Sequence, residues 1–534
     1  MRWAFTVPGE SFLGLLDALP EVGIRIVATR HEGGASFMAE AVGQLTGSPA
    51  AVMGTRAVGA GNMAIGIHTA RQNSTPLIAL IGQVERAFRG REAFQESELV
   101  ETPGGLTLGG SEIDDPALAP ALLTHVLTRM VYSRPGPVML SLPEDVLDLG
   151  TGRGPIDVPV AEELPVYGPW VREALLMLAN ARRPLILAGG GVRASGASDV
   201  LVAFAEATGV PVMAAWRRPD VFPNDHPLFL GMTGYGSART VRPRIESADA
   251  LLVIGCRLNE IASYEYTVPA ATTKWVHVDL SPRTAYAGLS APDLAIPADA
   301  RAWLSAAVEM QAGWGMFVLP EKVAPERAAY VEASIVDDGQ PWGGPGVHPG
   351  RVIATLNRML PADAIVTTDA GNFGLWLARG FQVKRDGRFL GPTSGAMGYG
   401  LPAAIAASLC EPERTVVAVC GDGGFAMTMN ELETAVREGA HPIAIVFDNL
   451  RYGTIEMHQR RRGSQPVATD LGPIDFAAVA TACGALGLRV TRQDEFEPAL
   501  RQALSAGRAA VLHLDLDQRW VSPDVIGRSS AIAP

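Results

Sequence analysis

The sequence lacks the features that mark nucleic-acid-binding and membrane proteins. Its 534 residues contain 44 Lys and Arg against 56 Asp and Glu, and no long basic run offsets the formal charge of −12, which argues against nucleic acid as a partner. No apolar stretch approaches the roughly 18 residues of a membrane span, and the N-terminus lacks the layout of a signal peptide. We therefore expect a cytoplasmic protein without a membrane partner.

Cysteine and histidine are scarce and scattered. The nine histidines form no HExxH group, and the cysteines, at 256, 410, 420 and 483, form no CxxC pair. Neither zinc nor a disulfide framework is indicated, and we interpret the cysteines as buried free thiols. What the chain does have is apolar residues, at 48%, and a length that predicts about three domains.

The predicted elements fall into three blocks in which strands and helices alternate. Proline-rich stretches near residues 150–168 and 319–350 separate the blocks, and we interpret them as linkers. The pattern predicts an α/β protein of three consecutive Rossmann-like or flavodoxin-like domains with parallel sheets, at residues 1–155, 165–325 and 345–525.

The third block contains two short apolar runs that both end in oxygen-bearing side chains. Residues 414–420 lead into Gly421-Asp422-Gly423-Gly424, a helix is expected over 427–437, and residues 443–447 lead into Asp448-Asn449. A right-handed crossover makes the two strands parallel, so their carboxyl ends open on one edge, where ligands of α/β sheets bind. Oxygens of Asp422 and Asn449 suit Mg²⁺, and the glycines suit a phosphate. The alternative for the GDG segment alone is a tight turn that happens to contain Asp.

The first block places a carboxylate at a comparable position. Glu32 follows the run 24–28 and precedes two glycines, so it can be presented to a ligand or can be an ordinary acid at a helix N-terminus. Glycine-rich loops at 54–62 and 82–84 follow two further strands. One edge of this block therefore collects several glycine-rich loops.

Seven segments follow one another in a recognisable order over nearly the whole chain. They are RHEGG (30–34), GxGN (59–62), STPLIALIGQV (74–84), REAFQE (91–96), RPGPVMLSLPEDV (134–146), TSGAMGYGLPAA (393–404) and GDG with its distant Asn. Together they resemble the thiamine diphosphate-dependent enzymes of the acetolactate synthase-like, or pyruvate oxidase-like, group. The resemblance implies a pyrimidine-binding, a central and a diphosphate-binding domain. It also implies a homodimer or homotetramer whose active site lies between the first domain of one subunit and the third of another.

The resemblance assigns roles to individual residues. Asp422 and Asn449 would hold Mg²⁺ through their side chains, and Arg451 through its backbone carbonyl. Glu32 would contact N1′ of the aminopyrimidine. Gly395 would accept from the 4′-amino group, and Met397 would hold the cofactor bent. The remaining positions implied for cofactor binding are Gly421, Gly423, Gly424, Tyr452, Gly453 and Thr454.

The implied chemistry explains why these residue types are needed. A buried Glu32 can share a proton with N1′, which favours the tautomer whose 4′-nitrogen removes the weakly acidic C2 proton of the cofactor. The bend at Met397 brings that nitrogen near C2. The resemblance thus implies a transferase or lyase that decarboxylates a 2-oxo acid and passes the acyl anion to a carbonyl acceptor. We add His31, Gln95 and His458 to Glu32 as catalytic candidates that contact substrate, with packing roles as the alternative.

Several positions depart from the acetolactate synthases. Those enzymes carry a substrate-lining tryptophan where this chain has His458, and a lysine where it has Glu144, which removes a positive charge. These departures leave the acceptor open. A simple 2-oxo acid decarboxylase and a non-catalytic cofactor-binding homologue are therefore kept as alternatives.

A flavin-dependent 2-oxo acid oxidase is a further alternative. Residues 231–234 partly resemble a flavin-contacting loop of the synthases, but residues 257–260 depart from the pattern, so FAD is not favoured. The glycine run 189–191 does not satisfy G-x-G-x-x-G and favours a structural turn over dinucleotide binding.

Overall fold

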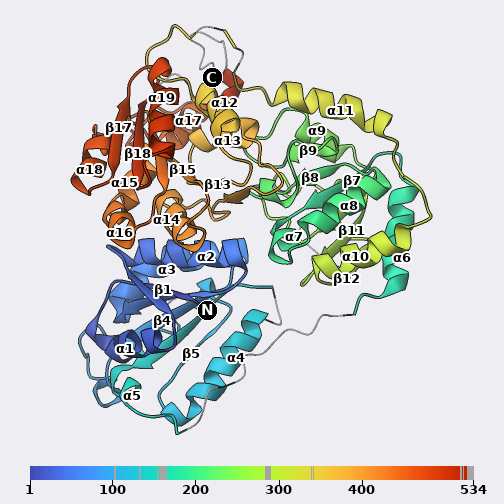
Figure 1. The fold of residues 1–534 in the computed structure, drawn as a ribbon. Coiled ribbons are helices and arrows are strands. Elements are labelled where there is room, and N and C mark those ends of the chain that lie inside the picture. The colour runs from blue at the N-terminus through green and yellow to red at the C-terminus, as the bar shows by residue number, and fades with distance from the viewer. Residues whose placement is uncertain are drawn as a thin grey trace.

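Three six-stranded sheets, one in each third of the chain, form the framework of the protein (Figure 1). The computed structural model describes residues 1–101, 104–131, 134–152, 156, 165–282, 290–337, 339–340, 342–517, 520 and 522–525. All pairings between the named strands are parallel, and most strand residues are buried, which explains their continuous apolar runs. The predicted α/β fold with three parallel sheets is therefore confirmed.

The N-terminal sheet has the strand order β2-β1-β3-β4-β6-β5. Its strands are β1 (Trp3–Thr6), β2 (Arg25–Ala28), β3 (Ala50–Thr55), β4 (Leu77–Gln83), β5 (Gly110–Glu112) and β6 (Pro137–Pro143). Its helices are α1 (Leu13–Glu21), α2 (Glu32–Thr46), α3 (Arg56–Asn73), α4 (Ala119–Val131) and α5 (Glu144–Leu147). The strands predicted in this block lie where the sequence placed them, within one or two residues.

The C-terminal sheet repeats that order as β14-β13-β15-β16-β18-β17. Its strands are β13 (Ile365–Thr368), β14 (Arg388–Leu390), β15 (Val416–Gly421), β16 (Ile443–Asp448), β17 (Leu486–Val490) and β18 (Ala510–Asp515). Its helices are α12 (Pro349–Met359), α13 (Phe373–Gly380), α14 (Gly400–Cys410), α15 (Asp422–Thr428), α16 (Glu431–Glu438), α17 (Gly453–Arg461), α18 (Phe476–Ala482) and α19 (Gln493–Leu504). The single helix predicted over 427–437 is wrong, because α15 ends at Thr428 and α16 begins at Glu431.

The central sheet has a different order, β12-β11-β10-β7-β8-β9, which is the doubly wound Rossmann arrangement. Its strands are β7 (Pro184–Ala188), β8 (Val212–Ala214), β9 (Phe229–Met232), β10 (Ala250–Ile254), β11 (Lys274–Asp279) and β12 (Leu294–Pro297). Its helices are α6 (Gly168–Ala179), α7 (Gly190–Ala194), α8 (Ser198–Thr208), α9 (Val241–Glu246) and α10 (Ala300–Gln311).

The two stretches interpreted as linkers differ from each other. Helix α11 (Pro320–Ala333) occupies much of the second stretch, so the segment interpreted as a linker is partly helical. Pro320 stands in the first turn of this helix, where its missing N–H costs nothing. Most of the first stretch lies outside the described residues.

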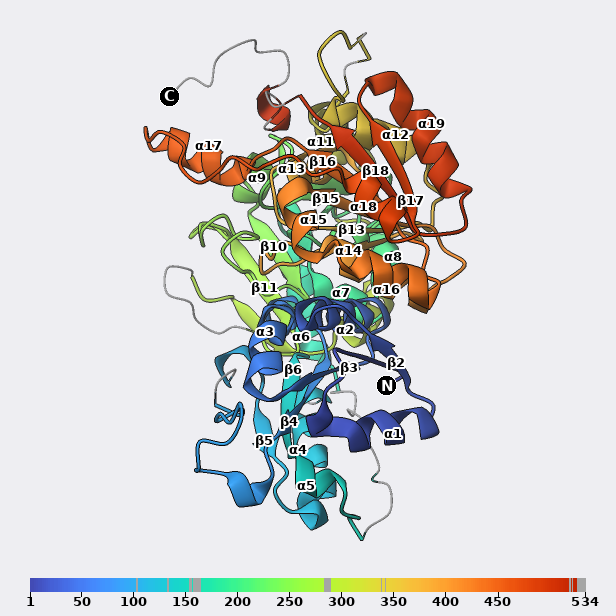
Figure 2. The ribbon, with the colours of Figure 1, turned by 90° about the vertical axis from the view of Figure 1, so that its left-hand side faces the viewer.

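The N-terminal and C-terminal domains of one chain share a core. Helices α2 and α3 lie between the first sheet and the C-terminal domain in both views (Figures 1 and 2). Phe37 of α2 meets Tyr399 edge to face, with ring centroids 5.4 Å apart, inside one cluster of buried residues from both domains. The fully buried Glu40 accepts hydrogen bonds from Tyr399 Oη at 2.5 Å and Thr75 Oγ1 at 2.8 Å. These bonds compensate a carboxylate that would otherwise be costly to bury.

Two further predictions concern cysteines and membranes. All four cysteines are free, but only Cys256 and Cys420 are buried, whereas Cys410 and Cys483 are half-buried. The prediction of buried thiols is therefore wrong for two of them. Among the described residues, no helix is both long enough and apolar enough to span a membrane.

Candidate active site

The carboxyl ends of β15 and β16 form one wall of a cavity of about 220 Å³. The strands are adjacent, with Gly421 opposite Phe447, so Asp422 and Asn449 come to the same edge. The prediction that the two strands are parallel is therefore confirmed, and the structure adds that they are neighbours. The cavity is lined by all the residues that the resemblance implied for this half of the site, namely Gly395, Met397, Gly421, Asp422, Gly423, Gly424, Asn449, Arg451, Tyr452, Gly453 and Thr454.

Asp422 lies in an electrostatic environment suited to a divalent cation. Its Oδ1 accepts from the Gly423 N–H at 2.8 Å and its Oδ2 from the Arg451 N–H at 3.3 Å. Burial, together with a hydrogen bond shared with Asp448, raises the pKa of Asp422 to about 7. Two adjoining carboxyl groups repel each other when both are ionised, and a bound Mg²⁺ would relieve that repulsion. The donor set therefore fits the metal that the resemblance implies.

Asn372 is a residue of this cavity that the sequence reasoning missed. Its Oδ1 accepts from Thr454 Oγ1 at 2.7 Å, which fixes the amide. Its buried Nδ2 has no hydrogen-bond partner among the residues that the structure describes. A buried donor without a partner is costly, and an anionic oxygen of a bound diphosphate would satisfy it. The signal that could have indicated Asn372 is its place in the short polar segment 369–372, which directly follows β13 at the carboxyl edge of the sheet.

The glycines beside Asp422 are required by close packing. A Cβ on Gly423 would lie 2.6 Å from the ring of Tyr452, and one on Gly424 would lie 2.5 Å from Asp369 Oδ2. Asp369 is completely buried, and this burial raises its pKa to about 6. The Gly400 N–H donates to its Oδ1. Asp369 thereby connects the Gly423-Gly424 turn with the segment after Met397.

Glu32 stands at the opposite half of the site, in the N-terminal domain. It begins α2 and is 9% exposed, and its Oε2 accepts from Asn62 Nδ2 of α3 at 2.9 Å. A Cβ on Gly59 would lie 3.6 Å from Oε1, so this oxygen has a glycine rather than a larger side chain beside it. The motif GxGN thus contributes both groups that surround Glu32.

His31 has a structural role that the sequence reasoning did not assign. Its Nδ1 accepts from the Gly33 N–H at 2.9 Å, which caps the N-terminus of α2. The ring is otherwise exposed, so its contact with substrate stays a prediction. The pattern of a polar residue just before Glu32-Gly33-Gly34 is the signal that could have indicated the cap.

Gln95 and Arg56 lie close together beside the end of β3 in the N-terminal sheet. Gln95 has a left-handed backbone with φ of 60°, and its carbonyl accepts from the Ala57 N–H at 3.4 Å. The neighbouring Arg56 contacts Glu10 at 3.2 Å and Glu144 at 3.1 Å. The expectation that Glu144 merely removes a positive charge is therefore incomplete, because Arg56 restores a cation beside it. Sequence reasoning missed Arg56, although a lone arginine in a glycine-rich loop was its signal.

The two halves of the site do not meet within one chain. Every described residue that lines the 220 Å³ cavity belongs to the C-terminal domain, so Glu32, His31 and Gln95 are not among them. His458 is exposed on α17 and does not line the cavity either. Helix α17 projects from the body of the C-terminal domain (Figure 2).

Comparison with known proteins identifies the family. Models of the N-terminal, central and C-terminal domains of thiamine pyrophosphate enzymes match residues 1–101, 171–307 and 369–514. A probable acetolactate synthase large subunit from Methanocaldococcus jannaschii is 30% identical over 98% of this chain and 90% of that relative. The chain belongs to the thiamine pyrophosphate enzymes. The resemblance to the acetolactate synthase-like group is confirmed, and with it the prediction of a thiamine diphosphate-dependent enzyme.

Two further relatives cover this thiamine pyrophosphate enzyme almost completely. The acetolactate synthase isozyme 2 large subunit of Escherichia coli is 28% identical over 96% of this chain and 92% of the relative. A sulfoacetaldehyde acetyltransferase of Rhodobacter capsulatus is 29% identical over 97% of this chain and 92% of the relative. The similarity therefore extends through all three domains.

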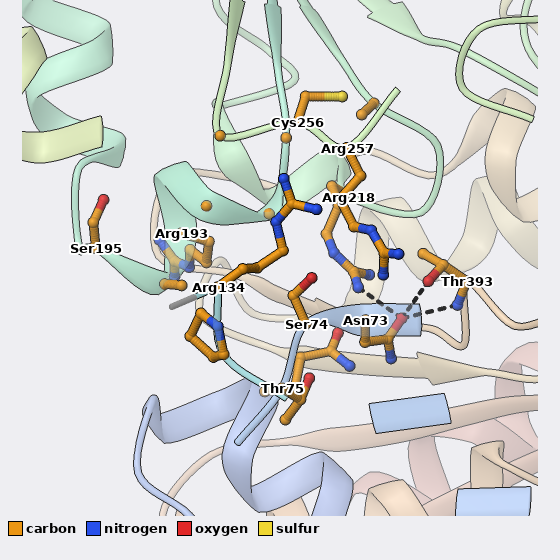
Figure 3. A pocket seen from close by; sticks show the side chains of 18 of the residues that line it. Asn73, Ser74, Thr75, Arg134, Arg193, Ser195, Arg218, Cys256, Arg257 and Thr393 are labelled. Carbon is orange, nitrogen blue, oxygen red and sulfur yellow. Dashed lines mark hydrogen bonds between the residues drawn. The ribbon is translucent and has the colours of Figure 1, made fainter. Parts of the chain in front are cut away.

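A second cavity, of about 230 Å³, lies where the three domains of the thiamine pyrophosphate enzyme meet (Figure 3). Several arginines line it, and two of them are bonded within the chain: Arg134 to Asp279 at 2.7 Å, and Arg257 to the carbonyl of Arg71 at 2.8 Å. A Cβ on Gly189 would lie 2.4 Å from the carbonyl oxygen of Gly255. The glycine run 189–191 thus permits close packing of two strand-end loops, as expected for a structural turn.

Proposed function

We propose that this enzyme decarboxylates a 2-oxo acid and transfers the acyl anion to a carbonyl acceptor, with thiamine diphosphate and Mg²⁺ as cofactors. The observation that carries the proposal is that two sheet edges present different groups. One edge has the buried Glu32, which is hydrogen-bonded to Asn62. The other has the cavity lined by Asp422, Asn449 and Met397. Thiamine diphosphate supplies a carbon nucleophile that stores the electrons released by decarboxylation. Relatives named acetolactate synthase support this reaction class.

The cavity of the C-terminal domain would hold the metal–diphosphate end. Asp422 and Asn449 would bind Mg²⁺ through side chains and Arg451 through its carbonyl. The adjoining Asp422 and Asp448 carboxyls favour a cation, and the unpaired Nδ2 of Asn372 favours a diphosphate oxygen. The remaining implied contacts are those of Gly421, Gly423, Gly424, Tyr452, Gly453 and Thr454, while Gly395 and Met397 would meet the bend of the cofactor.

Glu32 would hold the proton that activates the cofactor. Asn62 donates to Oε2 and orients the carboxyl group, which leaves Oε1 for a bond with N1′. A carboxyl group fixed in this way can hold and return one proton without leaving its position. His31, Gln95 and His458 stay candidates for contacts with the substrate.

A complete site would need two chains. We propose a homodimer or homotetramer, with domains at 1–155, 165–325 and 345–525, in which Glu32 of one chain faces the metal cavity of another. Exposed apolar side chains support this assembly: Val58, Ile65 and Phe94 in the N-terminal domain, and Met427 and Ile455 in the C-terminal domain. Phe94 is 71% exposed in the single chain, which is a large uncovered surface for an aromatic ring.

The reaction is proposed to proceed without flavin. In the 230 Å³ cavity Arg134 is bonded to Asp279 and Arg257 to the carbonyl of Arg71, so these two guanidinium groups are engaged within the chain. A colourless purified enzyme would agree with this proposal. A yellow one with flavin absorbance, and peroxide formation from a 2-oxo acid, would favour the oxidase instead.

The decisive experiment is incubation with a panel of 2-oxo acids, Mg²⁺ and thiamine diphosphate. Release of CO₂ and a ligated product, followed by mass spectrometry, is expected. Release of CO₂ with an aldehyde as the only product would indicate a simple decarboxylase. No release of CO₂ from any 2-oxo acid, although the cofactor is bound, would contradict the proposed function and favour a non-catalytic homologue.

A further inference from the structure

The segment 393–398, which carries Gly395 and Met397, is held by a residue from another domain. Asn73, the last residue of α3, belongs to the N-terminal domain of the same chain. Its Oδ1 accepts from the Thr393 N–H at 2.9 Å and from Thr393 Oγ1 at 2.7 Å (Figure 3). We call residues 393–398 the bend loop, because the proposed function places the bend of the cofactor against it.

The orientation of the Asn73 amide is fixed by its other partners. Arg218 of the central domain donates from Nη2 to the same Oδ1 at 2.8 Å (Figure 3). On the opposite side, Nδ2 donates to Oε1 of the fully buried Glu40 at 2.7 Å. An amide that faces donors with its oxygen and a carboxylate with its nitrogen cannot flip without losing both sets of bonds. Asn73 therefore presents a fixed acceptor to the bend loop.

The rest of the bend loop is attached differently at its two ends. At the start, Thr69 Oγ1 of α3 lies 2.9 Å from Ser394 Oγ, which adds a second bond to the same helix. At the end, the Gly398 carbonyl accepts from Thr428 Oγ1 at 3.0 Å inside the C-terminal domain. Gly395 lies between them with φ of 73°, and a Cβ there would meet no other atom within 4 Å. The start of the loop thus depends on α3 for its position.

We propose that Asn73 is a positioning residue, through which the N-terminal domain fixes the loop that bends the cofactor bound by the same chain. This inference rests on the proposed function, since it needs a cofactor at Gly395 and Met397. Asn73 does not line the metal cavity, and its bonds to the bend loop are those with Thr393. A displacement of about 1 Å in a positioning loop can cost about 100-fold in rate.

The first test compares Asn73→Ala with the wild-type holoenzyme. We expect turnover to fall by about 10- to 100-fold, because the bend loop loses its fixed acceptor. Affinity for thiamine diphosphate with Mg²⁺, measured by calorimetry, should change by less than about threefold, because the Asp422 end is untouched. Hydrogen exchange of the peptide containing residues 393–398 should become faster, with or without substrate. Wild-type turnover and exchange in this variant would overturn the proposal.

Variants of Thr393 separate positioning from a general loss of structure. Thr393→Ser keeps both donors to Asn73 and should behave like the wild type. Thr393→Val keeps only the N–H and should lose turnover by an intermediate factor. Equal activity of the serine and valine variants, together with an unaffected Asn73→Ala, would contradict the inference.

Asn224→Ala is the matched control for folding. Asn224 is also a buried amide between domains: it donates to the Pro219 carbonyl at 2.8 Å and accepts from the Val383 N–H at 3.0 Å. Its removal should lower thermal stability without faster exchange at 393–398. If both alanine variants lose turnover and loop protection equally, the effect is general and the inference fails. A wild-type enzyme that binds the cofactor but turns over no 2-oxo acid would instead contradict the proposed function.

Discussion

The N-terminal and C-terminal sheets have the same strand order but present different chemistry at the same edge. In both, the loop after the second strand points to the pyrimidine half of the proposed site: Glu32 after β2, and the bend loop after β14. The position after the third strand differs in charge. It is Arg56 after β3 and Asp422 after β15, and each residue begins the following helix.

This charge reversal shows how one scaffold serves two tasks. Arg56 is neutralised within the chain by Glu10 and Glu144, so the N-terminal edge offers no free cation there. Asp422 lies beside another carboxyl group, so the C-terminal edge attracts a cation. The shared fold supplies the edge, and the charge of the side chain after the third strand differs between the two domains.

The largest expected effect comes from replacing Glu32, the proposed proton carrier on the N-terminal edge. Glu32→Gln keeps the hydrogen-bonding shape but cannot hold the proton, so turnover should fall by about 100- to 10,000-fold with cofactor affinity nearly unchanged. Steady-state kinetics and calorimetry measure the two quantities. Glu112→Gln, in β5 of the same domain, is the control, and this variant should keep the turnover of the wild-type enzyme. Unchanged turnover in Glu32→Gln would remove Glu32 from the mechanism.

The matching change on the C-terminal edge should affect binding first. Asp422→Ala removes the proposed carboxylate ligand, and Mg²⁺-dependent retention of thiamine diphosphate should weaken by about 100-fold. Titration of the apoenzyme with cofactor, with and without Mg²⁺, tests this. Asp494→Ala, on α19, is an exposed control. If Asp422→Ala bound the cofactor as tightly as the wild type, the proposal that the C-terminal edge binds the metal through Asp422 would be contradicted.

The raised pKa of Asp422 predicts a smaller, pH-dependent effect. Because its pKa is about 7, the side chain carries a proton below that pH, and this proton competes with the cation. Mg²⁺ affinity should be constant above pH 7 and weaken by about tenfold per unit from pH 7 to pH 5. Calorimetric titrations across this range measure it. A flat profile would show that Asp422 is ionised throughout.

The smallest expected effect is structural. Arg56→Met should lower the free energy of unfolding by about 1 kcal/mol, because the side chains of Glu10 and Glu144 are 58% and 36% exposed and solvent screens their attraction to Arg56. The difference in unfolding free energy between variant and wild type should shrink in 1 M salt, because the Debye length there is about 3 Å and the ion pairs are screened. Urea unfolding at low and high salt measures both. A loss that is larger and insensitive to salt would mean that Arg56 acts as a buried charge.

The parts of the site that follow from local sequence were predictable. β15 and β16 follow one another as strands along the chain and pair in the sheet, and each is a short apolar run that leads directly into glycine or asparagine. Glu32 and its glycines are equally local. The break between α15 and α16 was not predictable, because apolar residues at helical spacing continue across residues 429 and 430.

Contacts between distant segments could not be predicted. Asn73 meets Arg218 and Thr393 across 145 and 320 positions, and nothing in the local pattern around Asn73 reveals this junction. Arg56 similarly reaches Glu144 across 88 positions. Such bonds depend on how whole domains pack, which composition and periodicity do not specify.

Helix α3 has a consequence for the proposed dimer. Its first turns brace Glu32 through Asn62, and its last residue holds the bend loop through Asn73. The 18 residues span about 27 Å. If Glu32 contacts the cofactor of the neighbouring chain, then α3 supports Glu32 in one active site and the bend loop in the other. A single helix then connects the two active sites of the dimer, and a displacement of either end of α3 should affect both.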